Sequence, residues 1–192
     1  MVKTEIKICG VRTPEIAREA ERLGAKYIGL IFAESPRRVT VAEAKSVIAA
    51  LEGKAKPVGV FVKETADEVD AIAGECGIGI VQLHRRASAD EVAILKAKGY
   101  EVWTLAGGAQ GDAVLFDSSH GDGETEMKKG AYKCVLAGGI GAANIAEALA
   151  SGADVIDVSG SLEETKGVKS VRLLREFFET AKNTENAKEK MR

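Results

Sequence analysis

Eight short apolar runs rich in Val and Ile constrain the fold of this chain more than any other feature. Amphipathic stretches of helical period separate them, an alternation typical of strand–helix units around a parallel sheet. The predicted strands cover residues 6–9, 27–32, 57–62, 78–83, 101–105, 113–117, 134–137 and 155–158. The predicted helices cover residues 14–23, 41–51, 66–75, 88–98, 142–151 and 170–180.

Eight strands, each followed by a crossover, can close on themselves. An open doubly wound sheet usually has fewer strands and a glycine fingerprint after the first, which Gly10-Val11-Arg12 does not provide. We therefore predict an α/β fold with a single (β/α)8 barrel over residues 1–181, followed by a polar tail over 182–192 that frays or extends the last helix.

The chain is 192 residues long, whereas such barrels usually have about 250. Two connections account for the difference. Residues 106–112 are too few for a full crossover helix, and only a weak turn at 125–130 follows the sixth strand. We expect a short or missing helix after the fifth strand. Helix boundary signals support the other predictions: Thr13 before Pro14 indicates a helix start, and glycines mark helix ends at Gly24, Gly77, Gly99 and Gly152.

Charge and composition exclude several classes of function. The formal net charge is −2, so we expect no nucleic-acid partner. No apolar segment reaches about 18 residues, so we expect no membrane span. Cys9, Cys76 and Cys134 are widely separated and odd in number, which argues against disulfides and zinc and favours a reducing cytoplasm. His84 and His120 are too few for a histidine cluster, and we expect no metal.

Polar residues that end apolar strands are the candidates for a functional site. In a (β/α)8 barrel, reactive groups project from the carboxyl ends of the strands into one mouth. A carboxylate that ends the apolar run 113–116 is costly to bury unless it has hydrogen-bond partners or a functional role. A lone cysteine or histidine in such a place is often only a packed core residue, and an arginine often only a solvated one. The candidates are Cys9, Arg37, Gln82, His84, Asp117, Asp157 and Ser159.

Small residues follow the seventh and eighth strands. Gly138-Gly139 and Ser159-Gly160-Ser161 stand where barrels commonly bind phosphate through backbone amides. A glycine pair alone is also an ordinary turn, but two such loops in these positions together indicate a phosphate site.

The motifs in order resemble those of the phosphoribosylanthranilate isomerase family. They are K-I-C-G-V-R-T from Lys7, S-P-R-R-V from Ser35, G-V-F-V from Gly59, V-Q-L-H from Val81, L-F-D ending at Asp117, L-A-G-G-I from Leu136 and D-V-S from Asp157. The resemblance spans the chain to about residue 178 and implies a (β/α)8 barrel that catalyses an Amadori rearrangement in tryptophan biosynthesis.

The resemblance also implies roles for individual residues. Asp117 would be the general acid that protonates the furanose ring oxygen, and Cys9 the general base that removes the proton from ribose C2. Because a free thiol has a pKa of about 8.5, Cys9 needs help to ionise, and the sequence does not show what provides it. Arg37 would pair with the anthranilate carboxylate. The amides of Gly139, Gly160 and Ser161 would hold the phosphate.

No cofactor is implied, and the only expected partner is a phosphorylated small molecule; a homodimer is compatible with the sequence. Three segments depart from the family pattern. Arg85 replaces the glycine of Q-L-H-G, serine and glycine exchange order in Ser159-Gly160-Ser161, and residues 120–125 carry Glu124 where the family has lysine. These changes affect binding more than the proposed acid and base.

Three alternatives stay open. A metal-dependent ribulose-phosphate epimerase would need more histidines than this chain has. An indole-glycerol-phosphate synthase type would use a strand lysine; Lys7 lies on the same strand face as Cys9, but we expect no acid partner for it. The third is a barrel that has lost catalysis and only binds a phosphorylated metabolite or packs against a partner.

Overall fold

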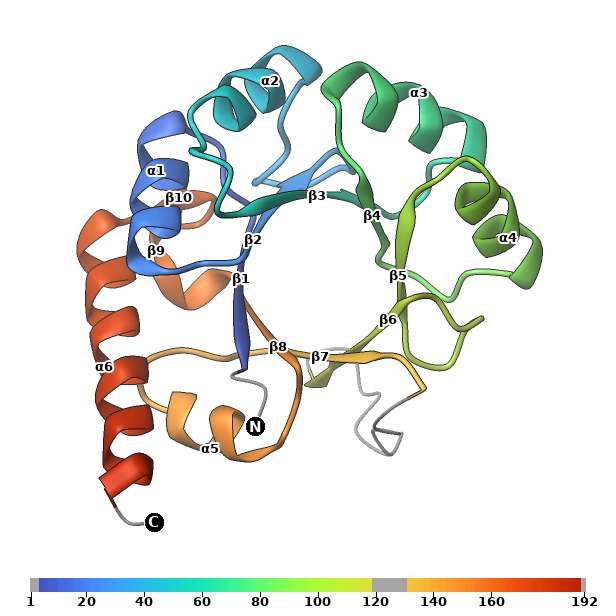
Figure 1. Ribbon diagram of the computed structural model, residues 1–192. Coiled ribbons are helices and arrows are strands. Elements are labelled where there is room, and N and C mark those ends of the chain that lie inside the picture. The colour runs from blue at the N-terminus through green and yellow to red at the C-terminus, as the bar shows by residue number, and fades with distance from the viewer. Residues whose placement is uncertain (1–3, 119–130, 191–192) are drawn as a thin grey trace.

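The computed structural model describes residues 4–118 and 131–190. Its eight parallel strands form a closed barrel in sequence order, as predicted. Figure 1 views the barrel nearly along its axis, with the helices outside the ring of strands. The strands are β1 (Glu5–Cys9), β2 (Tyr27–Ile31), β3 (Lys56–Phe61), β4 (Ile80–Leu83), β5 (Glu101–Leu105), β6 (Ala113–Asp117), β7 (Lys133–Ala137) and β8 (Val155–Val158).

Six α-helices surround the barrel in the described residues. They are α1 (Pro14–Leu23), α2 (Val41–Ala49), α3 (Ala66–Cys76), α4 (Ala89–Ala97), α5 (Ile145–Ala150) and α6 (Val171–Lys190). The prediction of a missing helix after the fifth strand is confirmed: residues 106–112 form only turns between β5 and β6. The turn expected at 125–130 lies outside the described residues.

The helix boundary signals act as predicted. Thr13 accepts a hydrogen bond from the Ile16 amide at the start of α1, where Pro14 occupies the first turn. At the other end Gly24 has φ 115°, a left-handed conformation that glycine adopts without a steric penalty. Helices α2, α3 and α4 each begin with a complete capping box.

The start predicted for the helix after β7 is wrong, and the extent of the last helix, which the sequence left open, is now defined. Helix α5 begins at Ile145 and not near residue 142, because the Asn144 side chain accepts the Gly141 amide (2.8 Å) and donates to the Gly139 carbonyl (3.1 Å). These local bonds hold the segment as a turn. Helix α6 extends through the expected tail as far as Lys190, the second of the two outcomes that we anticipated.

A short hairpin that the sequence did not predict follows β8. A 3-10 turn (Gly160–Leu162) leads into β9 (Glu163–Thr165), which pairs antiparallel with β10 (Val168–Lys169). Strands of three and two residues carry no readable periodicity. The described residues form three clusters of buried apolar side chains. The largest lies between the strands and the surrounding helices, a smaller one lies inside the barrel around Trp103, Leu115 and Val135, and a third contains Val114, Phe116 and Cys134. No helix in the described residues is long and apolar enough to cross a bilayer.

Candidate active site

The alternation of side chains along each strand shows which polar residues face the barrel interior. Leu115 belongs to the inner apolar core, and Asp117 lies two residues further on the same strand. Since side chains two residues apart point the same way, Asp117 faces inward at the carboxyl end of β6. The same relation holds for Gln82, two residues after Ile80, and for Asp157, two residues after Val155.

Strand β1 places Cys9 on that inward face. Ile8 belongs to the outer core between strands and helices, so Lys7 and Cys9 on either side of it face the interior. Gly29 on β2 pairs in register with Cys9. A Cβ atom at Gly29 would lie 2.8 Å from the Cys9 sulfur and 3.1 Å from the Lys7 ammonium, so the thiol and the ammonium share one small space.

Lys7 has an acid partner, which corrects our expectation that it has none. Its Nζ atom donates to Asp157 Oδ2 at 2.7 Å, and Lys7 is fully buried. The two residues are in register because β8 pairs with β1 to close the barrel. They are 150 residues apart in sequence, so only the closed topology reveals the pair.

Burial and neighbouring charges shift the pKa values of Cys9 and Lys7 in opposite directions. Burial raises the pKa of the Cys9 thiol above its ordinary value, and the positive charges of Lys7 and Lys169 offset part of that rise. Burial would lower the pKa of Lys7, but Asp157 and Cys9 together raise it above the ordinary lysine value. Lys7 is therefore an ammonium ion at neutral pH.

A second ion cluster lies beside this pair. Arg37 donates to Glu163 through Nε (2.6 Å) and Nη2 (2.9 Å), and Lys169 donates to the same carboxylate at 2.9 Å. Burial would raise the pKa of Glu163, but its bonds to Arg37, the Gly167 amide and Lys169 lower it to about 2. A Cβ atom at Gly160 would lie 3.5 Å from Arg37 Nη2, so the guanidinium lies at the loop after β8.

The carboxyl ends of β4 and β6 bring the next candidates together. Gln82 Nε2 lies 3.2 Å from His84 Nδ1, and His84 Nε2 lies 3.7 Å from Asp117 Oδ2. The Oε1 atom of Gln82 is buried without a partner among the described residues, as is Asp157 Oδ1. Two buried acceptors without donors suit a ligand that brings hydroxyl or N–H groups.

The two predicted anion loops lie side by side. Ser161 in the loop after β8 donates its hydroxyl to the Ile140 carbonyl in the loop after β7. Gly138 lies against Asp117, since a Cβ atom there would be 2.7 Å from Oδ1 of the carboxylate. Gly139 follows with φ 63°. Ser159 donates its hydroxyl to the Cys9 carbonyl at 3.1 Å, which links this loop to the end of β1.

The candidates thus stand in three connected groups at one end of the barrel. Cys9, Asp157, Ser159, Arg37 and Gly160 lie around β1 and β8. Gln82, His84 and Asp117 lie around β4 and β6, and Gly138, Gly139 and Ser161 lie in the loops after β7 and β8. The sequence prediction missed the partnership of Lys7 and the roles of Glu163 and Lys169. Groups of three or more possible metal ligands are absent from the described part of the chain.

The fold and these groups define a class: (β/α)8-barrel enzymes with ionisable residues at the carboxyl ends of the strands. A family model described as N-(5'-phosphoribosyl)anthranilate isomerase matches residues 6–180. The chain belongs to this family. A curated family member from Bacillus cereus is 34% identical, with 92% of this chain and 98% of the relative covered. Another, from Campylobacter jejuni, is 31% identical over 93% of this chain and 98% of its own length.

Solved structures agree with the fold. The phosphoribosylanthranilate isomerase of Thermus thermophilus is 27% identical, with a TM-score of 0.82 over 94% of this chain and 99% of that one. A second isomerase structure, 22% identical with a TM-score of 0.79, covers 94% of this chain and 99% of its own. That protein was solved with reduced 1-(o-carboxyphenylamino)-1-deoxyribulose 5-phosphate.

Proposed function

We propose that this chain isomerises N-(5'-phosphoribosyl)anthranilate to 1-(2-carboxyphenylamino)-1-deoxyribulose 5-phosphate in tryptophan biosynthesis, with Asp117 as general acid and Cys9 as general base. One observation carries the assignment of roles. The thiol and the carboxylate face inward at the carboxyl ends of β1 and β6 in one closed barrel, a place where both can address a single bound sugar.

The reaction needs a proton delivered and a proton removed. Asp117 protonates the ring oxygen, the C1–O bond breaks, and a Schiff base forms between C1 and the anthranilate nitrogen. Cys9 as thiolate then takes the proton from C2, which gives an enolamine that tautomerises to the ketone. His84 Nε2 lies 3.7 Å from Asp117 Oδ2. This supports Asp117 as the general acid, because an imidazole beside the carboxyl group can exchange protons with it.

The remaining candidates are assigned to binding. Asp157 Oδ1 and Gln82 Oε1 accept sugar hydroxyl groups, which supplies the donors that these buried atoms lack. The loops at Gly138-Gly139 and Ser159-Gly160-Ser161 bind the phosphate through backbone amides. Arg37, which Glu163 holds beside Gly160, binds the anthranilate carboxylate through its Nη1 side, outside the two bonds to Glu163.

Substitutions at the two reacting groups test the proposal. We expect Cys9→Ala and Asp117→Ala each to lower kcat by about 10²-fold or more, because each removes one proton transfer. Both variants should bind the reduced product analogue with a Kd within a few-fold of wild type. Turnover is measured in an assay coupled to indole-glycerol-phosphate synthase, and folding by circular dichroism.

Matched controls use a thiol and a carboxylate outside the barrel mouth. Cys76→Ala at the end of α3 and Asp70→Asn, whose carboxylate binds Lys98 on the surface, should keep wild-type turnover. The wild-type gene should also restore growth of a tryptophan auxotroph that lacks this isomerase. Wild-type protein that binds the analogue without turnover would instead identify a barrel that has lost catalysis, and full activity in both active-site variants would refute the assigned roles.

A further inference from the structure

Lys7 is a buried cation that the proposed acid and base do not use. Its side chain is fully buried inside the barrel, where its Nζ atom donates to Asp157 Oδ2 at 2.7 Å. Several other inward positions of the barrel carry apolar residues, among them Val58, Leu115 and Val135. Because a buried ion pair is often no more stabilising than well-packed apolar residues, fold stability does not explain a lysine here.

The position of the ammonium points to the neighbouring thiol. Lys7 and Cys9 lie two residues apart on one inward strand face, and the space left by Gly29 borders both groups. The carboxylate of Asp157 approaches Lys7 from β8, the strand on the other side of β1. The ammonium is thus fixed from one side while its neighbour on β1 is the candidate base.

The charges around Cys9 do not balance while its thiol is neutral. Among the described residues, three cations stand in this region: Lys7 on β1, Arg37 after β2 and Lys169 on β10. Two carboxylates oppose them, Asp157 on β8 and Glu163 on β9. The sum is +1 with a thiol and zero with a thiolate. Buried charges are least costly when they are paired, so the excess positive charge offsets part of the cost of ionising the buried sulfur.

We propose that Lys7 is a positioning residue whose ammonium, anchored by Asp157, offsets the cost of burying the Cys9 thiolate and so makes the ionised sulfur accessible for removal of the C2 proton. This inference rests on the proposed role of Cys9. In the step that it serves, the C2–H bond breaks and an S–H bond forms. The C2–H electron pair forms the C1=C2 bond while the iminium nitrogen receives the C1=N pair. Lys7 keeps its proton throughout.

Alkylation of Cys9 tests the inference without any need for turnover. The rate of modification by iodoacetamide reports the thiolate fraction, and peptide mass spectrometry separates Cys9 from Cys76 and Cys134. Across pH 6–10, and at pH values below both midpoints, we expect Cys9 to be alkylated about tenfold more slowly in Lys7→Met than in wild type, which corresponds to a midpoint about one pH unit higher. Superimposable profiles for Lys7→Met and wild type would overturn the inference.

A second variant guards against a Lys7→Met protein that does not fold. Lys7→Gln keeps a hydrogen-bond donor for Asp157 but removes the positive charge. If the charge of Lys7 acts on Cys9, this variant should be alkylated at Cys9 several-fold more slowly than wild type at pH 7, and an unchanged rate would count against the idea. The matched control is Lys133→Met, a lysine at the opposite end of the barrel whose Nζ binds the Tyr27 hydroxyl, and its profile should equal that of wild type.

Turnover then separates this inference from the proposed function. Lys7→Met should lower kcat at least tenfold at pH 7.5 with little change in KM, and higher pH should recover much of the loss as the thiolate forms; a purely structural defect would not recover. If Cys9→Ala stays active while Lys7→Met still slows alkylation, the role of Cys9 as base fails, and only the effect of Lys7 on the thiol stands. If Cys9→Ala is inactive while Lys7→Met resembles wild type in both assays, only the role of Lys7 fails.

Discussion

At the scale of single residues, Glu21 shows how one side chain can hold a connection in place. This residue of α1 is buried, and its carboxylate accepts three backbone amides from the segment between α2 and β3. Oε1 accepts from Lys54 and Ala55, both at 2.8 Å, and Oε2 accepts from Glu52 at 2.6 Å. Burial would raise the pKa of Glu21, but these amides lower it below the ordinary value.

We expect Glu21→Gln to lower the free energy of unfolding by about 2 kcal/mol. The amide side chain has one acceptor oxygen, so its NH2 group must face at least one backbone N–H that Glu21 now satisfies. Urea denaturation at pH 7 measures the loss. Glu15→Gln on the exposed face of the same helix is the control and should change stability by less than about 0.5 kcal/mol. Equal effects at the two positions would show that the three amide bonds contribute nothing.

The sequence could name residues but not always their partners. Their places at the ends of apolar runs identified Cys9, Gln82, Asp117 and Asp157 as candidates, because the end of a strand can be read from the local sequence. The bond between Lys7 and Asp157 joins the first strand to the last, so it depends on barrel closure, which no local pattern contains.

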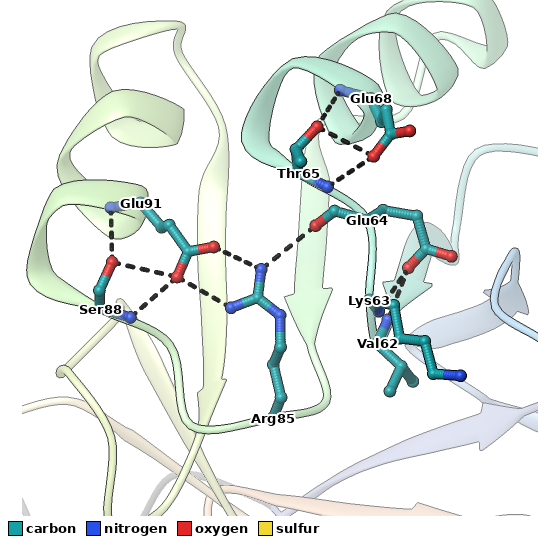
Figure 2. A network of polar contacts seen from close by, with 8 residues as sticks. All are labelled: Val62, Lys63, Glu64, Thr65, Glu68, Arg85, Ser88 and Glu91. Carbon is teal, nitrogen blue, oxygen red and sulfur yellow. Dashed lines mark hydrogen bonds and ion pairs between the residues drawn. The ribbon is translucent and has the colours of Figure 1, made fainter.

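At the scale of elements, Arg85 joins the starts of two helices (Figure 2). Its guanidinium donates to both carboxylate oxygens of Glu91, at 2.9 and 2.6 Å, and to the Glu64 carbonyl at 3.2 Å. Glu91 also completes the capping box of α4 with Ser88. The departure at Arg85 from the family glycine was visible in the sequence, but its bridge to the segment before α3 was not.

We expect Arg85→Ala to weaken this link between the two helices. The free energy of unfolding should then fall less in acid than it does in wild type. The bond from Arg85, and then the Ser88 amide, lower the pKa of Glu91 from the ordinary glutamate value of 4.5 to about 2. Because the folded pKa is the lower one, Glu91 stabilises the fold above about pH 4.5 and loses that contribution as pH falls towards 2. At pH 7 the variant should lose about 1 kcal/mol, since both side chains are partly exposed.

Urea unfolding at pH 7 and at pH 3.5 measures this effect. The difference in stability between the two pH values should be smaller in Arg85→Ala than in wild type. Arg172→Ala is the control, because Arg172 and Glu176 form an exposed pair on α6, with side chains 65% and 51% exposed. If Arg85→Ala loses as much stability between pH 7 and pH 3.5 as wild type does, Arg85 does not control the ionisation of Glu91.

At the scale of the whole molecule, the repeated strand pattern predicts the barrel, but the irregular segments leave no pattern from which they can be predicted. Eight apolar runs of strand length predict eight strands whose order in space equals their order in sequence. The hairpin β9–β10, which carries Glu163 and Lys169 to the mouth, is too short to leave a pattern. The extent of α6 is also open from sequence, because its polar end fits both a helix and a frayed tail.

Truncation within α6 (Figure 1) tests where the folded unit ends. Phe177, Phe178 and Ala181 are buried, whereas residues 182–187 are exposed or only partly buried. We expect a chain of residues 1–181 to keep wild-type turnover and a Tm within about 3 °C of wild type, because it loses almost no buried apolar surface. A chain of residues 1–176 also loses both phenylalanines, each worth about 3–5 kcal/mol. It should not fold at 37 °C by circular dichroism. A 1–181 chain that melts as early as the 1–176 chain would mean that the polar end of α6 belongs to the barrel.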